Sequence, residues 1–361
     1  MIKYLVLLIL LTPKISWAQS VPTLPKNVII MIGDGMGLSQ VSSAFYYQNK
    51  KSNFSRFRHV GLINTSSGSH KITDSAAGAT AFSTGVRTYN GAVAMSLDTS
   101  RIETIFEKYA DQKSLGIVAT SSVSHATPAS FYAHVKSRYE YENIATYLHS
   151  SPIDFIAGGG HKFFSQRQDS LNYLDSLISY GFEVDTANLK QSETHSIESK
   201  YAYLLASDGL PAAQKRGDFL NDATSIALDF LGQDNRGFIL MIEGSQIDWG
   251  GHENKADYLI NELLDFDKTI GSVLDFVDTN PGTLVIVTAD HETGGFTLGA
   301  DKADGMKGDY NKINPTFSTT GHSATMVPVF AYGSGADTFS GVYRNSDIYH
   351  KIFSLLSKNT K

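Results

Sequence analysis

The sequence predicts an α/β protein, a three-layer sandwich in which helices flank a central, mostly parallel β-sheet. Seven runs are apolar throughout and about the length of a strand: 27–32, 59–63, 115–120, 154–158, 237–242, 283–289 and 327–332. Continuous hydrophobicity is typical of strands that are buried on both faces. Helical patterns lie between these runs, for example at 101–110 and 256–277, and such alternation favours a parallel sheet covered by helices.

The first 18 residues have the pattern of a secretory signal peptide. Lys3 precedes an apolar stretch from Tyr4 to Leu11, and small residues lead to a predicted cleavage site after Ala18. The stretch is too short to span a bilayer, so a membrane anchor is the less favoured interpretation. We expect a periplasmic or secreted protein without a membrane anchor after cleavage, in which residues 19–361 form a single domain.

Composition limits both the ligands and the partners of the chain. It contains no cysteine, so any bound metal must be held by His, Asp and Glu side chains. Removal of residues 1–18 takes away Lys3 and Lys14 but no acid, which moves the formal charge from −6 to −8. An acidic chain of this kind has no electrostatic basis for binding nucleic acid, and we expect none.

Acidic and imidazole side chains follow three of the predicted strands. The segments are "GDG" after 27–32, "EGSQIDWGGH" after 237–242 and "DHETGG" after 283–289, and "TTGHSAT" precedes 327–332. Because ligands of open parallel sheets bind beyond the carboxyl ends of the strands, we expect these groups to converge. Each residue taken alone fits a turn, a polar loop or a structural histidine, but together they favour a site made of Asp34, Glu243, Asp248, His252, Asp290, His291 and His322.

These side chains can be divided by their chemistry. Imidazole with carboxylate suits zinc, whereas oxygen-rich groups suit magnesium. One group is Asp/His/His, one is Asp/Asp/His, and an oxygen group shares a carboxylate with the second. Paired metals suit in-line displacement at phosphorus, because one ion activates the nucleophile and the other stabilises the leaving oxygen. The three groups are Asp248, His252 and His322; Asp34, Asp290 and His291; and Asp34 with Glu243.

The segment "ITDSAAGATAFSTG" at 72–85 combines a carboxylate, a hydroxyl and a run of small residues. One interpretation is a tightly packed helix capped by Ser75 or Asp74, since both are good N-cap residues and alanine is the best helix former. The other interpretation places Ser75 at a helix N-terminus as a nucleophile that faces an anion. The convergence of the metal-binding groups favours the second.

Taken in order, "GDGMG", "DSAAGATA", "EGSQIDWGGH", "TADHETGG" and "GHS" resemble the signature motifs of alkaline phosphatases, from about Asn27 to Gly335. The resemblance implies an alkaline phosphatase-like catalytic domain over 19–361 that hydrolyses small phosphate monoesters. It implies that Ser75 becomes a phosphoserine and that Asp74 orients the site. One zinc, at the Asp34 group, would hold Ser75, and the other, at the Asp248 group, would stabilise the leaving oxygen.

The same resemblance implies a third metal site, a phosphate clamp and a homodimer. Magnesium would be bound by Asp34, Glu243 and Thr127, with His125 beside it, and Arg138 would clamp the phosphoryl oxygens. His125 and Trp249 stand at two positions that vary in the family. The pair is similar to compact bacterial enzymes, some of them cold-adapted. Trp249 predicts a weaker phosphate contact, and His125 leaves the third site open between magnesium and zinc.

Three other functions fit the residues less well. A sulfatase needs a C/S-x-P-x-R context, but Ser75 is followed by Ala-Ala-Gly. Phosphodiesterases of this scaffold commonly use threonine as the nucleophile, whereas Ser75 fills the motif position here and Thr73 is displaced from it. A protein that only binds metal or phosphate would need no Ser75.

Arg138, for its part, could be an ordinary solvated cation at a helix end.

Overall fold

The computed structural model of the chain describes residues 24–191, 195–302 and 308–358, and the predicted signal peptide at 1–18 lies outside these ranges. The largest element is a ten-stranded sheet of order β14-β2-β13-β8-β1-β7-β3-β4-β6-β5. Neighbouring strands are parallel, except that β13 runs antiparallel to both β8 and β2. The strands are β1 (Asn27–Gly33), β2 (His59–Asn64), β3 (Ser114–Ser122), β4 (Phe155–Gly159), β5 (Phe182–Asp185), β6 (Lys200–Leu204), β7 (Phe238–Gly244), β8 (Thr283–Thr288), β13 (Val327–Gly333) and β14 (Gly341–Arg344).

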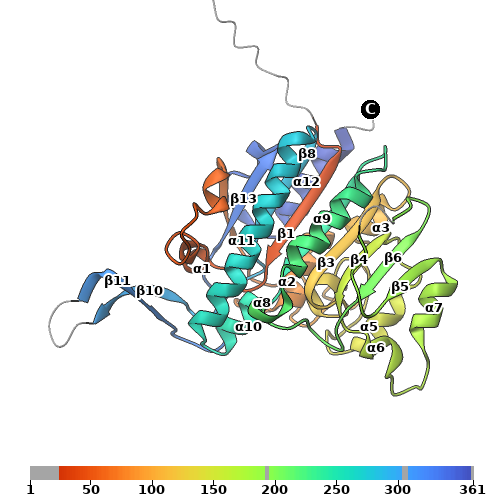
Figure 1. Ribbon diagram of the computed structural model, residues 1–361, viewed down its shortest axis with the longest axis horizontal. Helices are drawn as coiled ribbons and strands as arrows, with labels where there is room; N and C mark the ends of the chain where they lie inside the picture. Colours follow the sequence, from red (N-terminus) through yellow and green to blue (C-terminus); the bar gives the residue numbers. More distant parts are fainter. Residues whose placement is uncertain (1–23, 192–194, 303–307, 359–361) are drawn as a thin grey trace, which may run out of the picture.

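Helices cover both faces of this sheet, which confirms the predicted three-layer fold class. The long helices α9 and α11 pack against each other on one face, and α12 lies behind the sheet in the same view (Figure 1). The helices are α1 (Leu38–Ser43), α2 (Ser75–Thr84), α3 (Ile105–Tyr109), α4 (Ala126–Ala129), α5 (Tyr141–Leu148), α6 (Lys162–Ser165), α7 (Tyr173–Ser179), α8 (Ala213–Arg216), α9 (Phe219–Leu231), α10 (Gln246–His252), α11 (Ala256–Thr279) and α12 (Asp347–Ser357), with 3₁₀ turns at Asn53–Arg56 and Ala336–Phe339.

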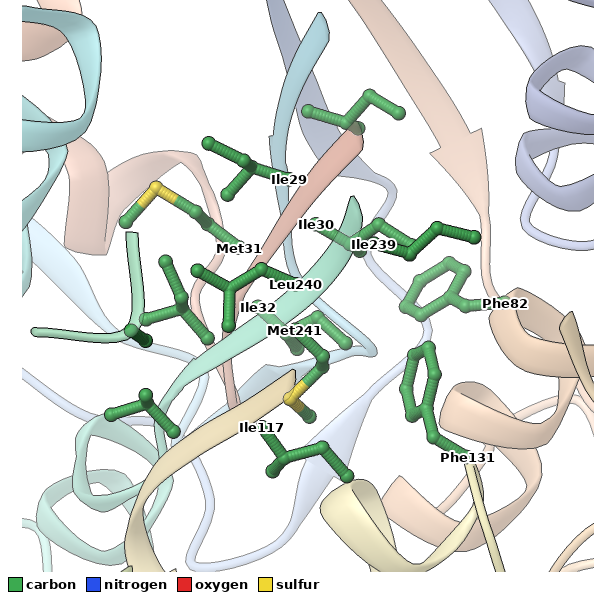
Figure 2. Close-up of a cluster of buried hydrophobic side chains, with 14 of the residues drawn as sticks. Ile29, Ile30, Met31, Ile32, Phe82, Ile117, Phe131, Ile239, Leu240 and Met241 are labelled. Carbon is green, nitrogen blue, oxygen red and sulfur yellow. The ribbon is translucent and has the colours of Figure 1, made fainter. Parts of the chain in front are cut away.

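The core lies on both faces of the central strands. Every residue of β3, β7 and β8 is buried. Side chains alternate between the two faces, as expected of strands: Ile29 and Met31 of β1 point to one side, whereas Ile239 of β7 points to the other, toward Phe82 of α2 (Figure 2). Burial on both faces explains why these strands are apolar throughout.

All seven predicted strands are present, with ends that differ by one or two residues from the predicted ones. Two expectations need correction. The strand at 59–64 is half exposed, because it lies next to the edge of the sheet. The helical pattern at 101–110 gives a helix only from Ile105 to Tyr109, because Thr104 caps it in a capping box with Glu107.

Two further pairs of strands lie outside the main sheet. β10 (Thr297–Lys302) and β11 (Gly308–Thr316) form an antiparallel arm that extends from the body (Figure 1). β9 (Glu292–Thr293) and β12 (His322–Ser323) form a ribbon of two residues each. No helix of the described residues is both long and apolar enough to cross a bilayer.

The order of the strands positions the predicted site. β8, β1, β7 and β3 are adjacent and parallel, so the segments that follow them meet at one edge of the sheet. Helix α2 packs beneath this edge, and all ten of its residues are buried. A Cβ atom at Gly78 would lie only 2.9 Å from Cβ of Asp290. The small residues of α2 therefore allow its close approach to the segment after β8.

This close approach predicts the effect of a single methyl group. In an exposed helix, Gly→Ala would stabilise by roughly 0.5–1 kcal/mol, but in Gly78→Ala the methyl group has to displace Asp290. We expect a net loss of about 1–3 kcal/mol of unfolding free energy, typical of overpacking, in urea denaturation. Gly299→Ala in β10 is the control, because its Cβ would have nothing closer than Asn314 O at 3.7 Å. A Gly78→Ala protein more stable than the wild type would contradict the contact.

Candidate metal centre and nucleophile

Asp34 lies in the turn that follows β1, at the middle of the site. The turn requires glycine at the next position, because Gly35 has a φ of +71° and a Cβ there would lie 2.8 Å from Cα of Asp248. The Gly35 N–H donates to Asp290 Oδ1 at 3.2 Å. The turn thus brings the segments after β1, β8 and β7 together.

The first group of candidate ligands is Asp34, Asp290 and His291. Asp290 and His291 are adjacent in sequence, and their side chains would diverge in an extended strand. β8 ends at Thr288, and beyond it the chain turns so that His291 Nε2 lies 3.2 Å from Asp290 Oδ2 and 3.4 Å from Asp34 Oδ1. All three side chains are fully buried. One divalent cation would be within reach of all three.

The second group is Asp248, His252 and His322. The sequence left open whether the segment after β7 is a helix or a loop. It forms α10, and the four-residue spacing on a helix places His252 Nε2 3.3 Å from Asp248 Oδ1. His322, in β12, brings its Nε2 within 3.6 Å of the same oxygen.

The hydrogen bonds of these two histidines fix which ring nitrogen faces Asp248. His252 Nδ1 lies 2.6 Å from Thr320 O, and His322 Nδ1 lies 2.9 Å from Thr73 O. Since carbonyl oxygens only accept, each Nδ1 must carry its proton, which leaves an unprotonated Nε2 on each neutral ring. The two Nε2 atoms are 3.1 Å apart and would both be acceptors. A bound metal ion, or a proton on one of the two rings, removes this repulsion between acceptors.

The third group is Asp34, Glu243 and His125, whose ligand atoms lie within 4.8 Å of one another. Glu243 is the next-to-last residue of β7, and His125 directly precedes α4. Thr127, in the first turn of α4, is fully buried, and its hydroxyl acts to lower the pKa of Glu243. The structure therefore brings Asp34 into two groups at once.

Burial makes the carboxylates of this centre difficult to ionise. It raises the pKa of Asp34, assisted by the charges of Asp290 and Asp248. It also raises the pKa of Glu243 to about 8 and that of Asp290 to about 6. Each value is well above the usual one for its residue. The protein alone thus lacks the positive charge that this centre needs.

The histidines divide into two kinds. Burial lowers the pKa of His291 and lowers that of His125 to about 4, so both rings are neutral near pH 7. The hydrogen bond to Asp248 raises the pKa of His252 to about 9. Burial acts to raise the pKa of Asp248, but the bond from His252 and the neighbouring imidazoles hold it well below its usual value.

The donor set fits divalent cations. Among the described residues, three buried atoms of the third group have no hydrogen-bond partner: Asp34 Oδ2, Glu243 Oε1 and His125 Nδ1. Buried polar atoms are nearly always hydrogen-bonded, so atoms without partners that also face one another mark places for ions. Carboxylate and imidazole ligands suit zinc in the first two groups, and the third group has more oxygen relative to nitrogen if Thr127 contributes.

Ser75 is the first residue of α2 and lies at the edge of the first group. Its Oγ is 3.2 Å from His291 Nε2 and 3.5 Å from Asp34 Oδ1. The helix cap is Asp74, which accepts from the Ala77 N–H at 3.0 Å. Of the two cap residues that the sequence left open, the structure thus uses Asp74. The Ser75 hydroxyl is therefore not needed to cap the helix.

Arg138 lies beside this helix end. It is in a loop, not at a helix end, and its side chain is only 13% exposed, so it is not a solvated cation. Its Nη1 donates to Asp74 Oδ2 at 3.1 Å. Burial acts to raise the pKa of Asp74, but Arg138 and backbone N–H groups keep it below the usual value. Asp74 therefore stays ionised and holds the guanidinium next to Ser75.

Trp249 lies next to the third group. Its ring meets the ring of His125 edge-on, with centroids 6.2 Å apart. A Cβ at Gly209 would lie 2.5 Å from the far edge of the indole, so Trp249 packs on the loop after β6. The Trp249 ring is therefore held by packing on both sides.

Three residues of the centre were missed by the sequence analysis. Thr293 donates to Asp248 Oδ1 and lies 3.1 Å from His291 Nδ1, so its hydroxyl joins the first two groups. Ser121 donates to Glu243 Oε2 at 3.2 Å. Glu292 follows His291 directly and is buried. Thr293 and Glu292 lie within "DHETGG", and their position next to ligands was the available signal.

Removal of metal should make stability fall as pH rises. The raised pKa values of Glu243 and Asp290 mean that the folded protein favours the protonated acids. The stability that each acid contributes is therefore lost as pH rises from its ordinary pKa to about 8 for Glu243 and to about 6 for Asp290. His252 adds a contribution that is lost as pH rises through about 9. The contribution of Asp248, whose pKa is lowered, is already complete above its ordinary pKa and adds no slope here.

From pH 7 to pH 9, above the ordinary pKa of His125 and His291, we therefore expect the free energy of unfolding of the metal-free protein, measured in urea, to fall by more than about 1.4 kcal/mol, the equivalent of one pKa unit. Glu243→Gln removes one of these contributions and should reduce the fall. The metal-loaded protein should show no such fall, because the ions compensate the carboxylates. A metal-free protein equally stable at pH 7 and pH 9 would contradict these pKa shifts.

Known proteins are similar to this chain over most of its length. The chain matches the family model described as alkaline phosphatase over residues 25–315. It is 32% identical to alkaline phosphatase 3 of Bacillus subtilis, over 93% of this chain and 90% of that protein. It is 48% identical to the solved alkaline phosphatase of the Antarctic bacterium TAB5, with a TM-score of 0.92 over 93% of this chain and 99% of that one.

A cold-active alkaline phosphatase from a psychrophilic Shewanella species is 30% identical, with a TM-score of 0.82 over 91% of this chain and 99% of that one. The matches cover most of the chain, and the match to the family model includes the candidate ligands from Asp34 to His291. The chain therefore belongs to the alkaline phosphatase family, a family of metal-dependent phosphomonoester hydrolases.

Proposed function

We propose that the chain hydrolyses small phosphate monoesters of broad type through a phosphoserine at Ser75, with two zinc ions and a third ion, magnesium or zinc. The Asp34, Asp290 and His291 group would hold one zinc, and the Asp248, His252 and His322 group the other. When bound, these ions would lower the pKa of the attacking oxygen and stabilise the charge on the leaving oxygen. The third ion would be held by Asp34, Glu243 and Thr127, beside His125.

The observation that carries this proposal is the position of the Ser75 hydroxyl. It lies 3.2 Å from a candidate metal ligand and at the N-terminus of a ten-residue helix. Capping does not require it, because Asp74 caps the helix. A helix N-terminus favours an anion, and a phosphoryl group on Ser75 would be one.

The reaction has two displacements at phosphorus. In the first, Ser75 Oγ loses its proton and forms a bond to phosphorus, while the bond from phosphorus to the alcohol oxygen breaks. In the second, water attacks the phosphoserine, the bond from phosphorus to Ser75 Oγ breaks, and the serine regains a proton. Inorganic phosphate and the alcohol leave.

Arg138 would bind the phosphoryl oxygens. A guanidinium carries five N–H groups, and Asp74 accepts from one of them, at Nη1. The remaining donors form a planar fork that suits phosphate. Trp249 offers no cation to the phosphate, so we propose that its contact is weak or passes through water.

The third site depends on His125. Solved variants of the TAB5 enzyme, in which one histidine is replaced by glutamate or aspartate, have Mg bound in the site called M3. An imidazole offers nitrogen, whereas magnesium prefers oxygen ligands. We assign the corresponding position to His125, the imidazole of the group with Asp34 and Glu243, and propose that it weakens magnesium binding.

The remaining assignments rest on the sequence and on the family. Residues 19–361 would be a single catalytic domain, released into the periplasm or medium after cleavage of residues 1–18. We assign the enzyme as a homodimer on family resemblance alone. Substrates are small phosphate monoesters, and the acidic charge of the chain argues against nucleic acid as a partner.

The phosphoserine is tested with Ser75→Ala. We expect kcat/KM for an aryl phosphate monoester to fall at least about a thousandfold, as is usual when a nucleophile is removed, with zinc content unchanged. Ser83→Ala is the control, since Ser83 is also buried in α2 and donates only to the Thr80 carbonyl. Acid quenching should trap phosphate on the wild type but not on Ser75→Ala. A Ser75→Ala enzyme within tenfold of wild-type activity would contradict the covalent step.

The phosphate clamp is tested with Arg138→Lys, which keeps the charge but loses the fork. Hydrogen bonds to charged groups contribute roughly 1.5–3 kcal/mol, so kcat/KM should fall about ten- to a hundredfold and inorganic phosphate should inhibit more weakly. Arg236→Lys, whose exposed side chain pairs with Asp234, is the control and should leave both unchanged. If inhibition by phosphate is as strong in Arg138→Lys as in the wild type, Arg138 does not bind phosphate.

A further inference from the structure

Two candidate metal ligands depend on the smallest sheet of the structure. His291 immediately precedes β9, and His322 is the first residue of β12. In this ribbon His322 pairs with Thr293, and Ser323 pairs with Glu292. A two-stranded ribbon has little stability of its own, and this one has only two residues in each strand. Something outside the ribbon must therefore fix the positions of both histidines.

The carboxylate of Glu292 connects the ribbon to the surrounding structure. Its Oε1 accepts from Gln40 Nε2 at 2.9 Å and from the Phe296 N–H at 3.0 Å. Its Oε2 accepts from the hydroxyl of Ser323, on the opposite strand. The carboxylate thus joins both strands of the ribbon and the turn that follows β9.

The same contacts reach the turn that carries Asp34. Gln40 is fully buried in α1, six residues after Asp34, and its Nε2 also donates to Thr293 O at 2.9 Å. A Cβ at Gly37 would lie 2.4 Å from Glu292 Cγ, so α1 begins in direct contact with this side chain. One carboxylate therefore lies between the segments that carry Asp34, His291 and His322.

Glu292 is not itself in any of the three ligand groups. It is 4% exposed, and both of its oxygens are used by protein donors. Burial of a carboxylate near other carboxylates is costly, and a hydrophobic residue would fill the space at less cost. Its contacts across three segments give a reason for a carboxylate at this position.

We propose that Glu292 is a positioning residue that holds His291 and His322 in place for zinc. This inference rests on the metal centre of the proposed function. The Nδ1 contact to Thr73 O fixes the rotation of the His322 ring, and Glu292 fixes the backbone that carries it. Loss of the Glu292 carboxylate removes its contact to Gln40 of α1 and its contact between the two strands of the ribbon, and the site then binds zinc more weakly. Loss of such outer contacts typically costs ten- to a hundredfold in metal affinity.

The test measures the rate at which a chelator removes zinc from the purified, zinc-loaded enzyme, with zinc per chain determined by elemental analysis. Glu292→Ala should lose zinc at least tenfold faster than the wild type. Glu253→Ala is a matched control, because Glu253 also directly follows a candidate ligand, His252, but is exposed and pairs with Lys255. Its rate should stay within twofold of the wild type.

Glu292→Gln separates position from charge. The amide oxygen still accepts from Phe296 and Gln40, and the amide nitrogen can donate to the Ser323 hydroxyl, which can also accept. Glu292→Gln should therefore restore zinc retention to within about threefold of the wild type. Release from Glu292→Gln as fast as from Glu292→Ala would overturn a positioning role.

A second variant covers the case in which Glu292→Ala does not fold. Ser323→Ala removes one donor and should lose zinc about threefold faster than the wild type. In addition, the visible spectrum of the cobalt-substituted enzyme should change in Ser323→Ala but not in Glu253→Ala, since only the former alters the ligand geometry. Wild-type behaviour of Ser323→Ala in both measurements would overturn the role of the Glu292 contact.

The two proposals fail differently. A wild-type chain that holds no zinc would overturn the metal centre itself. A wild-type chain that holds zinc, together with a folded Glu292→Ala variant that retains it equally well, would overturn only the role assigned to Glu292.

Discussion

Mutual repulsion among buried carboxylates is the constraint on which the rest of this structure depends. Asp34, Glu243, Asp248 and Asp290 lie within one edge of a sheet and are at most 5% exposed. Burial and like charge raise the pKa of three of them, and only Asp248 is compensated, by imidazoles. Such a cluster is unfavourable for a protein alone and favourable for one that binds cations. The parallel strands β8, β1 and β7 create it, because their carboxyl ends meet.

Neighbouring residues around the metal centre have separate roles. Asp74 caps α2 and holds Arg138, so Ser75 is left to react. The Nδ1 atoms of His252 and His322 contact backbone carbonyls, so their Nε2 atoms remain available. Thr293 links two ligand groups, and Glu292 anchors the ribbon between them. The chemistry proposed for the centre therefore relies also on residues that bind neither metal nor substrate.

The sequence predicted the buried strands and the groups at their ends for a physical reason. A strand buried on both faces must be apolar throughout, and Asp34, Glu243 and Asp290 stand out because they follow such strands. The ribbon of β9 and β12 was not predicted, because two residues show no periodicity. The contact of Gln40 with Glu292 joins residues 252 positions apart, and no local pattern encodes it. The choice of Asp74 over Ser75 as the cap, and the helical form of α10, likewise depended on tertiary packing.

In the active enzyme, cations should occupy all three ligand groups. Anomalous X-ray diffraction from crystals of the active protein, recorded on both sides of the zinc absorption edge, tests this most directly. Two zinc peaks are expected, one bounded by Asp34, Asp290 and His291 and one by Asp248, His252 and His322. A third ion, zinc or magnesium, should lie beside Glu243. Crystals of fully active protein without density for an ion at these groups would contradict the account.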